Sequence, residues 1–157
     1  MTQHILEREC VIPGPVDAVF EFVADARNLN AITPPWLKIQ IVSPDNLEMR
    51  AGLVIEYRMW LRWIPFHWES EITQWGPPHR FTEVQRRGPY KSWVHAHVFE
   101  DHPEGTLLTD LVTYTAPGGR MVRSLLVTPD LERIFDYRQE KLIENFATGR
   151  AGRAETA

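Results

Sequence analysis

The sequence predicts an α+β domain in which a curved antiparallel sheet of about seven strands is covered by a long C-terminal helix. Three observations support this prediction. Apolar residues recur at helical spacing near both ends of the chain, whereas they alternate with polar residues through the middle. Turn-forming Pro, Gly and Asn residues interrupt that middle section every ~8 to 12 residues, which is typical of an antiparallel meander. A sheet with one apolar face must bury that face, and the long helix is the available cover.

The N-terminal part of the chain predicts one strand followed by two short helices. Residues 4–12 are half apolar and end at the turn signal Pro13-Gly14-Pro15, as expected of a strand. Pro15 suits the first turn of a helix, and apolar residues recur at helical spacing over 16–23. A second short helical turn is expected over 24–30. It should end before Thr33-Pro34-Pro35, because a residue that precedes proline is disfavoured in helical geometry.

Six strands are expected to follow, each separated from the next by a turn. They lie near residues 36–42, 52–61, 66–75, 79–86, 90–100 and 106–115. The intervening turns fall at Ser43 to Asn46, Trp63 to Pro65, Gly76 to Pro78, Arg87 to Pro89 and Asp101 to Gly105.

The last predicted element is a helix over 129–147. It follows a turn at Pro117-Gly118-Gly119, with Thr128 as its capping residue and Pro129 at its first position. Its apolar stripe is formed by Leu131, Ile134, Phe135, Leu142, Ile143 and Phe146. No linker divides the chain, so we expect one domain over residues 1–148 and a flexible tail over 149–157.

Composition excludes several classes of function. The net charge of −4 comes from 21 acidic and 17 basic residues mixed along the chain, so we expect no nucleic-acid partner. The single Cys10 cannot form an internal disulfide and is expected to be a small core residue. No apolar run approaches the ~18 to 20 residues that cross a bilayer, and the N-terminus lacks the order of a signal peptide. We therefore expect a soluble cytoplasmic protein without membrane insertion.

All six tryptophans lie between residues 36 and 93, within the predicted sheet. Alternation places Trp68 on the inner face, together with Tyr57 and Met59, and it places Trp93 on the same face of its strand as His95 and His97. It places Trp60 and Trp75 on the outer face, and it leaves Trp36 at a strand start and Trp63 in a turn. On that outer face we expect cross-strand ion pairs of Arg58 or Arg62 with Glu69 or Glu71.

The order of these elements and several short motifs resemble the helix-grip fold of the SRPBCC, or START-like, superfamily. The similar motifs are the segment from Ile12 to Val23, Pro78-His79-Arg80-Phe81, the segment from Gly88 to Glu100 and the segment from Gly105 to Tyr114. The resemblance covers about residues 4 to 147. It implies a cavity between the sheet and the long helix, in a superfamily that includes polyketide cyclases and lipid-transfer domains but carries very different functions on one scaffold.

The strand over 90–100 bears its histidines on one face, with Trp93, His95, His97 and Phe99 together. Hydrophobicity alone would bury the opposite face, which includes Val94 and Val98, but the resemblance implies that the aromatic and histidine face lines the cavity. The next strand then directs Asp110 inward, beside His97 or His95 depending on register. A buried carboxylate needs a partner, so we expect a His–Asp pair.

Three roles are open for this pair. The histidine and Asp110 would satisfy each other inside the core, orient a ligand, or carry out general acid–base chemistry. The His-x-His spacing of His95 and His97 could also chelate a metal with Asp110 as third ligand, but the sequence analysis finds no further ligand on an adjacent inward position. We therefore expect neither a metal nor another cofactor.

The function expected is binding of a small hydrophobic molecule such as a lipid, an isoprenoid or an aromatic polyketide. The residues expected to line the site are Tyr57, Met59, Trp68, Trp93, His95, His97, Phe99, Asp110, Val112, Tyr114, Phe135, Leu142 and Phe146. One alternative is a cyclase or dehydratase that uses His95, His97 and Asp110 as catalytic groups. Another is a protein-interaction module with an exposed patch of Trp60, Trp63 and Trp75, which is compatible with a homodimer.

Overall fold

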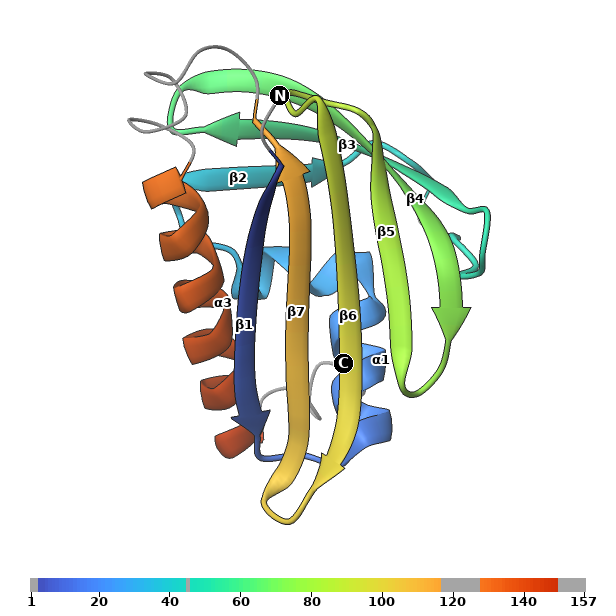
Figure 1. Ribbon diagram of the computed structural model, residues 1–157, viewed down its shortest axis with the longest axis vertical. Helices are drawn as coiled ribbons and strands as arrows, with labels where there is room; N and C mark the ends of the chain where they lie inside the picture. The colour runs from blue at the N-terminus through green and yellow to red at the C-terminus, as the bar shows by residue number, and fades with distance from the viewer. Residues whose placement is uncertain (1–2, 45, 117–127, 150–157) are drawn as a thin grey trace.

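A seven-stranded antiparallel sheet forms the body of the protein and curves around its helices (Figure 1). This computed structural model describes residues 3–44, 46–116 and 128–149. The strand order is β1-β7-β6-β5-β4-β3-β2, which confirms the predicted six-stranded meander and places β1 beside β7. The strands are β1 (His4–Ile12), β2 (Leu37–Ile41), β3 (Val54–Leu61), β4 (Ile64–Gly76), β5 (Arg80–Arg87), β6 (Ser92–His102) and β7 (Gly105–Thr115).

Within the described residues, three helical segments cover the inner face of the sheet. They are α1 (Val16–Ala24), the 3-10 helix η1 (Ala26–Ile32) and the long C-terminal helix α3 (Thr128–Ala147). Helix α1 packs against β6 and β7, whereas α3 packs against β1 and η1. The predicted turn at Pro117 to Gly119, the capping side chain of Thr128 and residues 150–157 of the predicted tail lie outside the described residues.

One half of the inner face is filled by apolar side chains, and we call it the packed half. Its centre is Phe20 of α1, whose ring centroid lies 5.3 Å from that of Trp75, 5.7 Å from Phe81 and 5.1 Å from Phe99. Leu142 of α3 is fully buried in the same cluster. Helix α1 therefore fills the space between the sheet and the C-terminal half of α3.

Strand β4 contains an irregularity that overturns the predicted position of Trp75. Ile72 pairs with Glu83, but the next paired residue is Gln74, opposite Thr82, so Thr73 is an extra residue in the strand. An inserted residue reverses the alternation of the side chains that follow it. Trp75 consequently points inward against Phe20 rather than outward.

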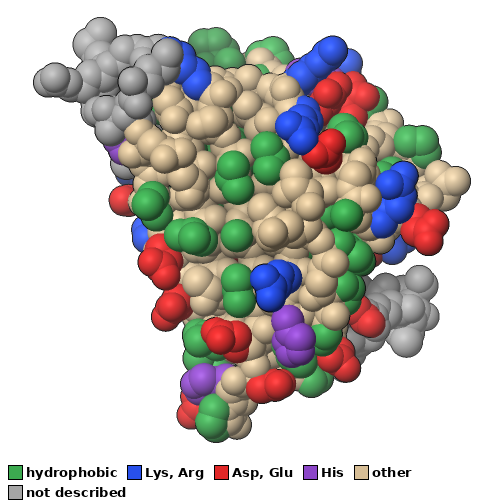
Figure 2. Space-filling model, turned by 45° about the vertical axis from the view of Figure 1, so that its right-hand side comes forward, with side chains coloured by type: hydrophobic (Ala, Val, Ile, Leu, Met, Phe, Trp, Pro, Cys, Tyr) green, Lys and Arg blue, Asp and Glu red, His purple; other side chains and the backbone are tan. Residues whose placement is uncertain are grey.

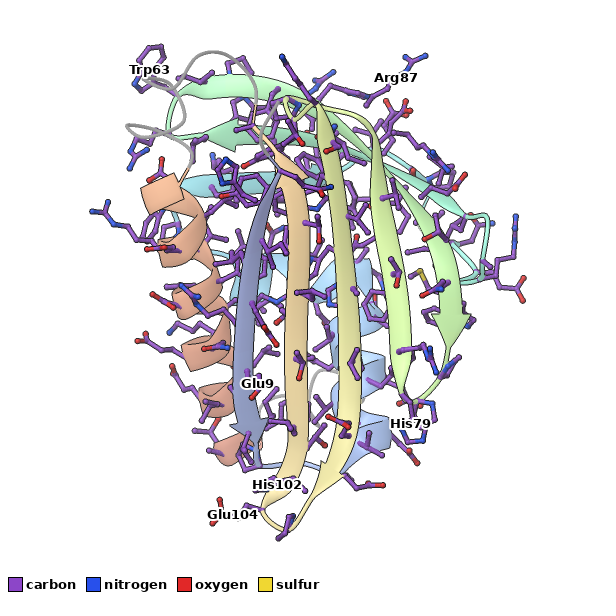
Figure 3. All side chains as sticks on the ribbon, viewed as in Figure 1. Glu9, Trp63, His79, Arg87, His102 and Glu104 are labelled. Atoms are coloured by element: carbon purple, nitrogen blue, oxygen red, sulfur yellow. The ribbon has the colours of Figure 1, made fainter. Side chains whose placement is uncertain are left out.

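The outer face carries scattered rather than clustered apolar side chains, as the islands of green in Figure 2 show. The predicted interaction patch is wrong, because Trp75 is inside and Trp60 is half-buried, whereas Trp63 is 82% exposed. Figure 3 shows Trp63 projecting from the end of the molecule opposite the β6–β7 hairpin. A homodimer stays a prediction.

The ion pairs of the outer face also differ from the prediction. Glu71 pairs with Arg86 and Glu69 with Arg87, both across the β4–β5 ladder. Arg62 instead pairs with Asp130 at the start of α3, with a nitrogen–oxygen distance of 3.0 Å. In the described part of the chain, no helix combines the length and apolar character needed to cross a membrane.

Candidate functional site

The other half of the inner face encloses a cavity of about 430 Å³, and we call it the cavity half. The cavity lies between strands β2 to β6 on one side and η1 and α3 on the other. Ile39, Met59, Phe66, Trp68 and Ile134 are among the apolar side chains that border it. This volume falls within the range of ~300 to 1,000 Å³ that is common for small-molecule pockets.

Part of the predicted lining borders this cavity. The structure places six predicted residues around it, namely Tyr57, Met59, Trp68, Trp93, His95 and Phe135. Their role in binding a ligand remains a prediction.

The other predicted lining residues lie elsewhere. Phe99 and Leu142 are fully buried in the packed half, where α1 covers them, and Phe146 packs against Phe22 of α1 at a centroid distance of 5.6 Å. Val112 and Tyr114 are buried in the apolar cluster around Trp93, behind the cavity wall. These residues lie on the predicted inner face, but neither the resemblance nor the spacing of apolar residues could show how far the cavity extends along that face.

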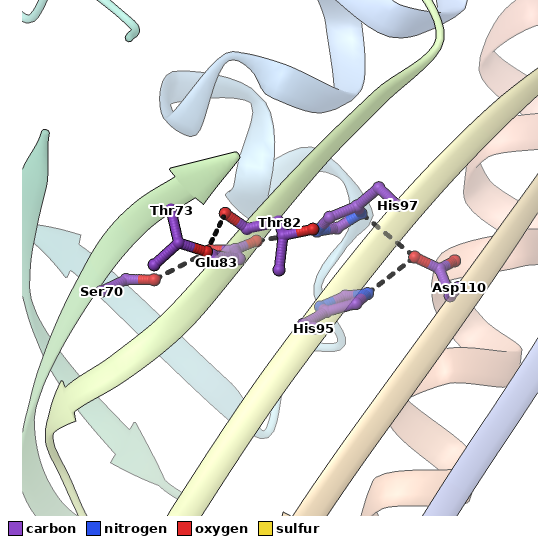
Figure 4. Close-up of polar contacts among 7 residues, drawn as sticks. All are labelled: Ser70, Thr73, Thr82, Glu83, His95, His97 and Asp110. Carbon is purple, nitrogen blue, oxygen red and sulfur yellow. Dashed lines mark hydrogen bonds and ion pairs between the residues drawn. The ribbon is translucent and has the colours of Figure 1, made fainter. Parts of the chain in front are cut away.

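His97 and Asp110 also lie behind the wall, in a buried polar cluster that spans four strands (Figure 4). Nε2 of His95 lies 2.8 Å from Oδ1 of Asp110, and Nδ1 of His97 lies 3.2 Å from the same oxygen. On its other side, Nε2 of His97 lies 2.8 Å from Oε2 of Glu83, whose Oε1 accepts a hydrogen bond of 3.0 Å from Ser70. The predicted His–Asp pair is therefore one part of a continuous chain of polar contacts.

The register explains why both histidines reach Asp110. Asp110 of β7 lies directly opposite His97 of β6, and Glu83 of β5 lies directly opposite His95. The hydrogen bonds of Nε2 instead run diagonally between neighbouring strands, from His95 to Asp110 and from His97 to Glu83. The imidazole rings of His95 and His97 stack with their centroids 3.7 Å apart. Phe81 stacks on the other face of His97 at 4.0 Å and fixes the position of that ring.

Burial and neighbouring charges give the two histidines opposite properties. Burial and the adjacent charge of His97 lower the pKa of His95 to about 4. Burial also opposes protonation of His97, but its contacts with Asp110 and Glu83 outweigh burial and raise its pKa. Burial disfavours ionisation of Glu83, yet the hydrogen bond and charge of His97 outweigh it and lower the pKa of Glu83 to about 2. At neutral pH, His95 is the neutral imidazole of the pair.

His95 is the member of the cluster that combines a carboxylate partner with access to the cavity. It is 4% exposed and borders the cavity, whereas His97 and Asp110 are each 1% exposed. Nε2 of His95 bonds to Asp110, and the imidazole ring makes no other hydrogen bond to a described residue. This arrangement can orient a polar group of a ligand or exchange a proton with it.

The sequence analysis did not identify Glu83 as a site residue. The signal was present, because alternation over residues 79–86 places Glu83 on the same face as Phe81. An inward glutamate beside two inward histidines would have indicated a network rather than a pair.

The sequence analysis also missed Arg138 of α3. It lies three residues after Phe135 and four before Leu142, and therefore within the apolar stripe of the helix. Arg138 borders the cavity, and its charge contributes to the lowered pKa values of Glu83 and Asp110. A cation thus lies on the helix side of the cavity.

Glu83, His95 and His97 also form a group that could hold a metal ion. One ligand atom from each lies within 4.8 Å of the others, and Asp110 would orient both imidazoles from behind. A metal would have to displace the hydrogen bond between His97 and Glu83, and it would lie near the positive charge of Arg138. The expectation that the protein holds no metal stays a prediction.

A second hollow of about 670 Å³ lies beside α1, and it is not our candidate site. Asp17, Glu21 and Asp25 are among the α1-side residues that line it. None of the members of the histidine cluster borders it. The smaller cavity combines an apolar wall with buried titratable groups, which is the usual combination in a binding or active site.

Comparison with known proteins supports the same fold and names a family. Residues 12–147 match the family model for polyketide cyclase/dehydrase and lipid transport proteins. The chain belongs to this family. That membership confirms the resemblance to the SRPBCC superfamily, although no curated protein gives a significant match to the whole sequence.

Solved structures of low sequence identity share this helix-grip architecture. Protein CV1439 from Chromobacterium violaceum superposes with a TM-score of 0.72 at 10% identity, over 90% of this chain and 96% of that one. Protein Ms6760 from Mycobacterium smegmatis gives a TM-score of 0.69 at 19% identity, over 89% and 88% of the two chains. Major latex-like protein 151 from Panax ginseng gives 0.68 at 14% identity, over 92% and 97%. At these low identities, the similarities show that this chain has the same fold.

Proposed function

We propose that this protein binds a small hydrophobic molecule in the cavity between the sheet and α3. The cavity itself is the observation that supports the proposal, because most of the side chains around it are apolar or aromatic. Its family includes lipid-transport proteins, which agrees with a ligand of this class.

The cavity wall is built to hold an apolar molecule in a fixed position. Trp68 and Trp93 meet edge to face at a centroid distance of 5.4 Å, and Tyr90 lies 4.8 Å from Trp93. Such interlocked rings lose little freedom when a ligand packs against them, and each offers a large contact area. Burial of apolar ligand surface would contribute ~25 cal/mol per Å² before the cost of association.

The test compares two isoleucines of the same helix, of which one borders the cavity. Ile134 lines the cavity, whereas Ile143 is exposed on α3. Ile134→Trp should fill part of the cavity and weaken binding of the neutral fluorescent probe N-phenylnaphthylamine by about tenfold or more, whereas Ile143→Trp should leave it unchanged. Fluorescence titration measures both, and native mass spectrometry of the freshly purified protein checks for a bound molecule.

Two results would contradict the proposal. One is a wild-type protein that binds neither the neutral probe nor any compound of a hydrophobic panel. The other is equal loss of probe binding in both tryptophan variants, since that result would place the probe outside the cavity.

A second candidate function is general acid–base catalysis by His95, of the type used by cyclases and dehydratases. The observation in its favour is the contact of 2.8 Å between Nε2 of His95 and Asp110, in a histidine that also borders the cavity. Asp110 would hold the imidazole in one orientation, and His95 would take a proton from a bound molecule or return one to it.

His95→Gln separates catalysis from binding. If a cavity-bound compound is converted by the wild-type protein, the variant should lower the turnover by ~10²- to 10⁴-fold while it still binds N-phenylnaphthylamine. Full turnover in the variant would rule out the acid–base role and leave the binding proposal intact.

A further inference from the structure

We propose that the ligand of this cavity is an apolar carboxylic acid and that Arg138 binds its carboxylate. This inference rests on the proposed binding function and adds the chemical class of the ligand. Four features of the structure support it, beginning with the position of Arg138 itself.

Arg138 borders the cavity from the middle of α3 without a partner for its charge. Its Nε is buried and makes no hydrogen bond to any residue that the structure describes. Among the described residues, no carboxylate oxygen lies within 4.0 Å of its guanidinium, whereas nine other basic side chains lie within that distance of a carboxylate. A guanidinium that is half-buried beside apolar groups and unpaired loses hydration without compensation.

The acidic groups nearest to the cavity contact residues other than Arg138, although Oδ2 of Asp110 is buried without a hydrogen bond among the described residues. Both oxygens of Glu83 have partners, one in Ser70 and the other in His97. Oδ1 of Asp110 contacts both histidines of the cluster. Arg138 acts on these carboxylates only through its field, which contributes to their lowered pKa values.

The rim of the cavity repeats this pattern of occupied acids. Asp130 borders the cavity near the start of α3, but it accepts two hydrogen bonds from Arg62, at 3.0 and 3.1 Å. Asp130 and Arg138 are eight residues apart on one helix, about two turns, so they lie along the same side of the cavity. Because Asp130 is paired with Arg62, it does not neutralise Arg138, and a ligand carboxylate would form that ion pair instead.

The chemistry of a guanidinium and the composition of the cavity wall select an apolar acid. A planar guanidinium matches a carboxylate in a bidentate pair, and such a pair strengthens where water is excluded. Tyr57 adds a second donor, because burial raises the pKa of its hydroxyl, which makes no hydrogen bond to a described residue. The remaining wall, with Trp68, Phe135 and Ile134, suits an aliphatic or aromatic body.

Competition between a matched acid and alcohol tests the inference. Dodecanoate and dodecanol share one chain and differ in the charged group, and each would displace the neutral probe N-phenylnaphthylamine. At about pH 8, where the acid is ionised, wild-type protein should bind dodecanoate about tenfold or more tightly than dodecanol. Arg138→Gln should reduce that ratio to about one while it retains the neutral probe. Arg133→Gln, on the exposed face of the same helix, should keep the wild-type ratio.

Arg138→Lys keeps the charge but not the bidentate geometry, so its ratio should fall between those of the wild type and Arg138→Gln. It also carries the test if Arg138→Gln does not fold.

The other outcomes overturn either the role of Arg138 alone or the binding function together with it. Equal binding of acid and alcohol by the wild-type protein, or a preference that survives in Arg138→Gln, overturns the role of Arg138 and leaves hydrophobic binding standing. That result would mean that Arg138 only balances the charges of Glu83 and Asp110. Failure of the probe, the acid and the alcohol alike to bind overturns the binding function and this inference with it.

Discussion

The packed half and the cavity half of the inner face come from the same strands and the same alternation of side chains. On β6, Phe99 is fully buried in the packed half, whereas Trp93 and His95 border the cavity. On α3, Leu142 is buried in the packed half, whereas Phe135 borders the cavity. The difference is α1, whose Phe20 fills the space above one half and does not reach the other.

This comparison shows that an inward apolar position becomes core only where a helix lies close enough to cover it. The polar cluster marks the boundary between the two halves. His97 stacks on Phe81 of the packed half, and its neighbour His95 contacts Phe135 of the cavity half at a centroid distance of 5.4 Å. His97 and Asp110 are therefore buried behind the wall, whereas His95 and Glu83 of the same cluster border the cavity.

The largest effect should come from a phenylalanine of the packed half compared with one of the cavity half. Phe99→Ala removes a side chain that is 0% exposed and should lower the free energy of unfolding by ~3–5 kcal/mol. Phe66→Ala on the cavity wall removes a partly exposed side chain and should cost about 1–2 kcal/mol, because it already borders empty space. Urea denaturation measures both, and equal losses would mean that the two halves are packed alike.

A smaller effect should appear in the pH dependence of stability at the boundary. The folded pKa of His95 is about 4, below its ordinary 6.5, so between these values the unfolded chain binds a proton that the folded protein excludes. The contribution of His95 is therefore complete above pH ~6.5 and lost as the pH falls toward 4, by about 3 kcal/mol in total.

His95→Gln isolates this contribution from those of the carboxylates. Glu83 loses its stabilising effect in a lower range, as the pH falls from its ordinary 4.5 toward about 2. The variant should flatten the curve of unfolding free energy between pH ~6.5 and 4 and leave the fall below that range. A variant curve parallel to that of the wild type across the upper range would show that His95 is not held neutral.

The smallest effect should come from the outer face. Trp63 is 82% exposed, so Trp63→Ala should change the unfolding free energy by no more than ~0.5 kcal/mol and leave the elution volume in gel filtration unchanged. A loss above ~1 kcal/mol together with a later elution would show that Trp63 is covered by a second copy of the chain.

Alternation and turn residues predicted the sheet well, because both are local properties of the chain. The inward direction of Asp110 and the outward direction of Val94 agree with the structure once the sheet face is assigned by resemblance. The predicted outward direction of Trp75 is wrong because one extra residue in β4 reverses the alternation, and no turn residue in the sequence marks that position. Glu83 and Arg138 follow the same periodicity as their neighbours, but they were not predicted as site residues because a single charged residue in an apolar pattern is usually solvated.

By itself the sequence determined the order of the elements and, with the resemblance, the face on which His95, His97 and Asp110 lie. These properties follow from spacing along the chain, which is fixed before the chain folds. The tertiary structure alone decided that α1 fills half of the inner face and that His95 pairs with Asp110 while His97 pairs with Glu83. It also decided that Arg138 lies on the cavity wall with no ion pair among the described residues. These depend on strand register and on distances between residues far apart in sequence, which periodicity does not encode.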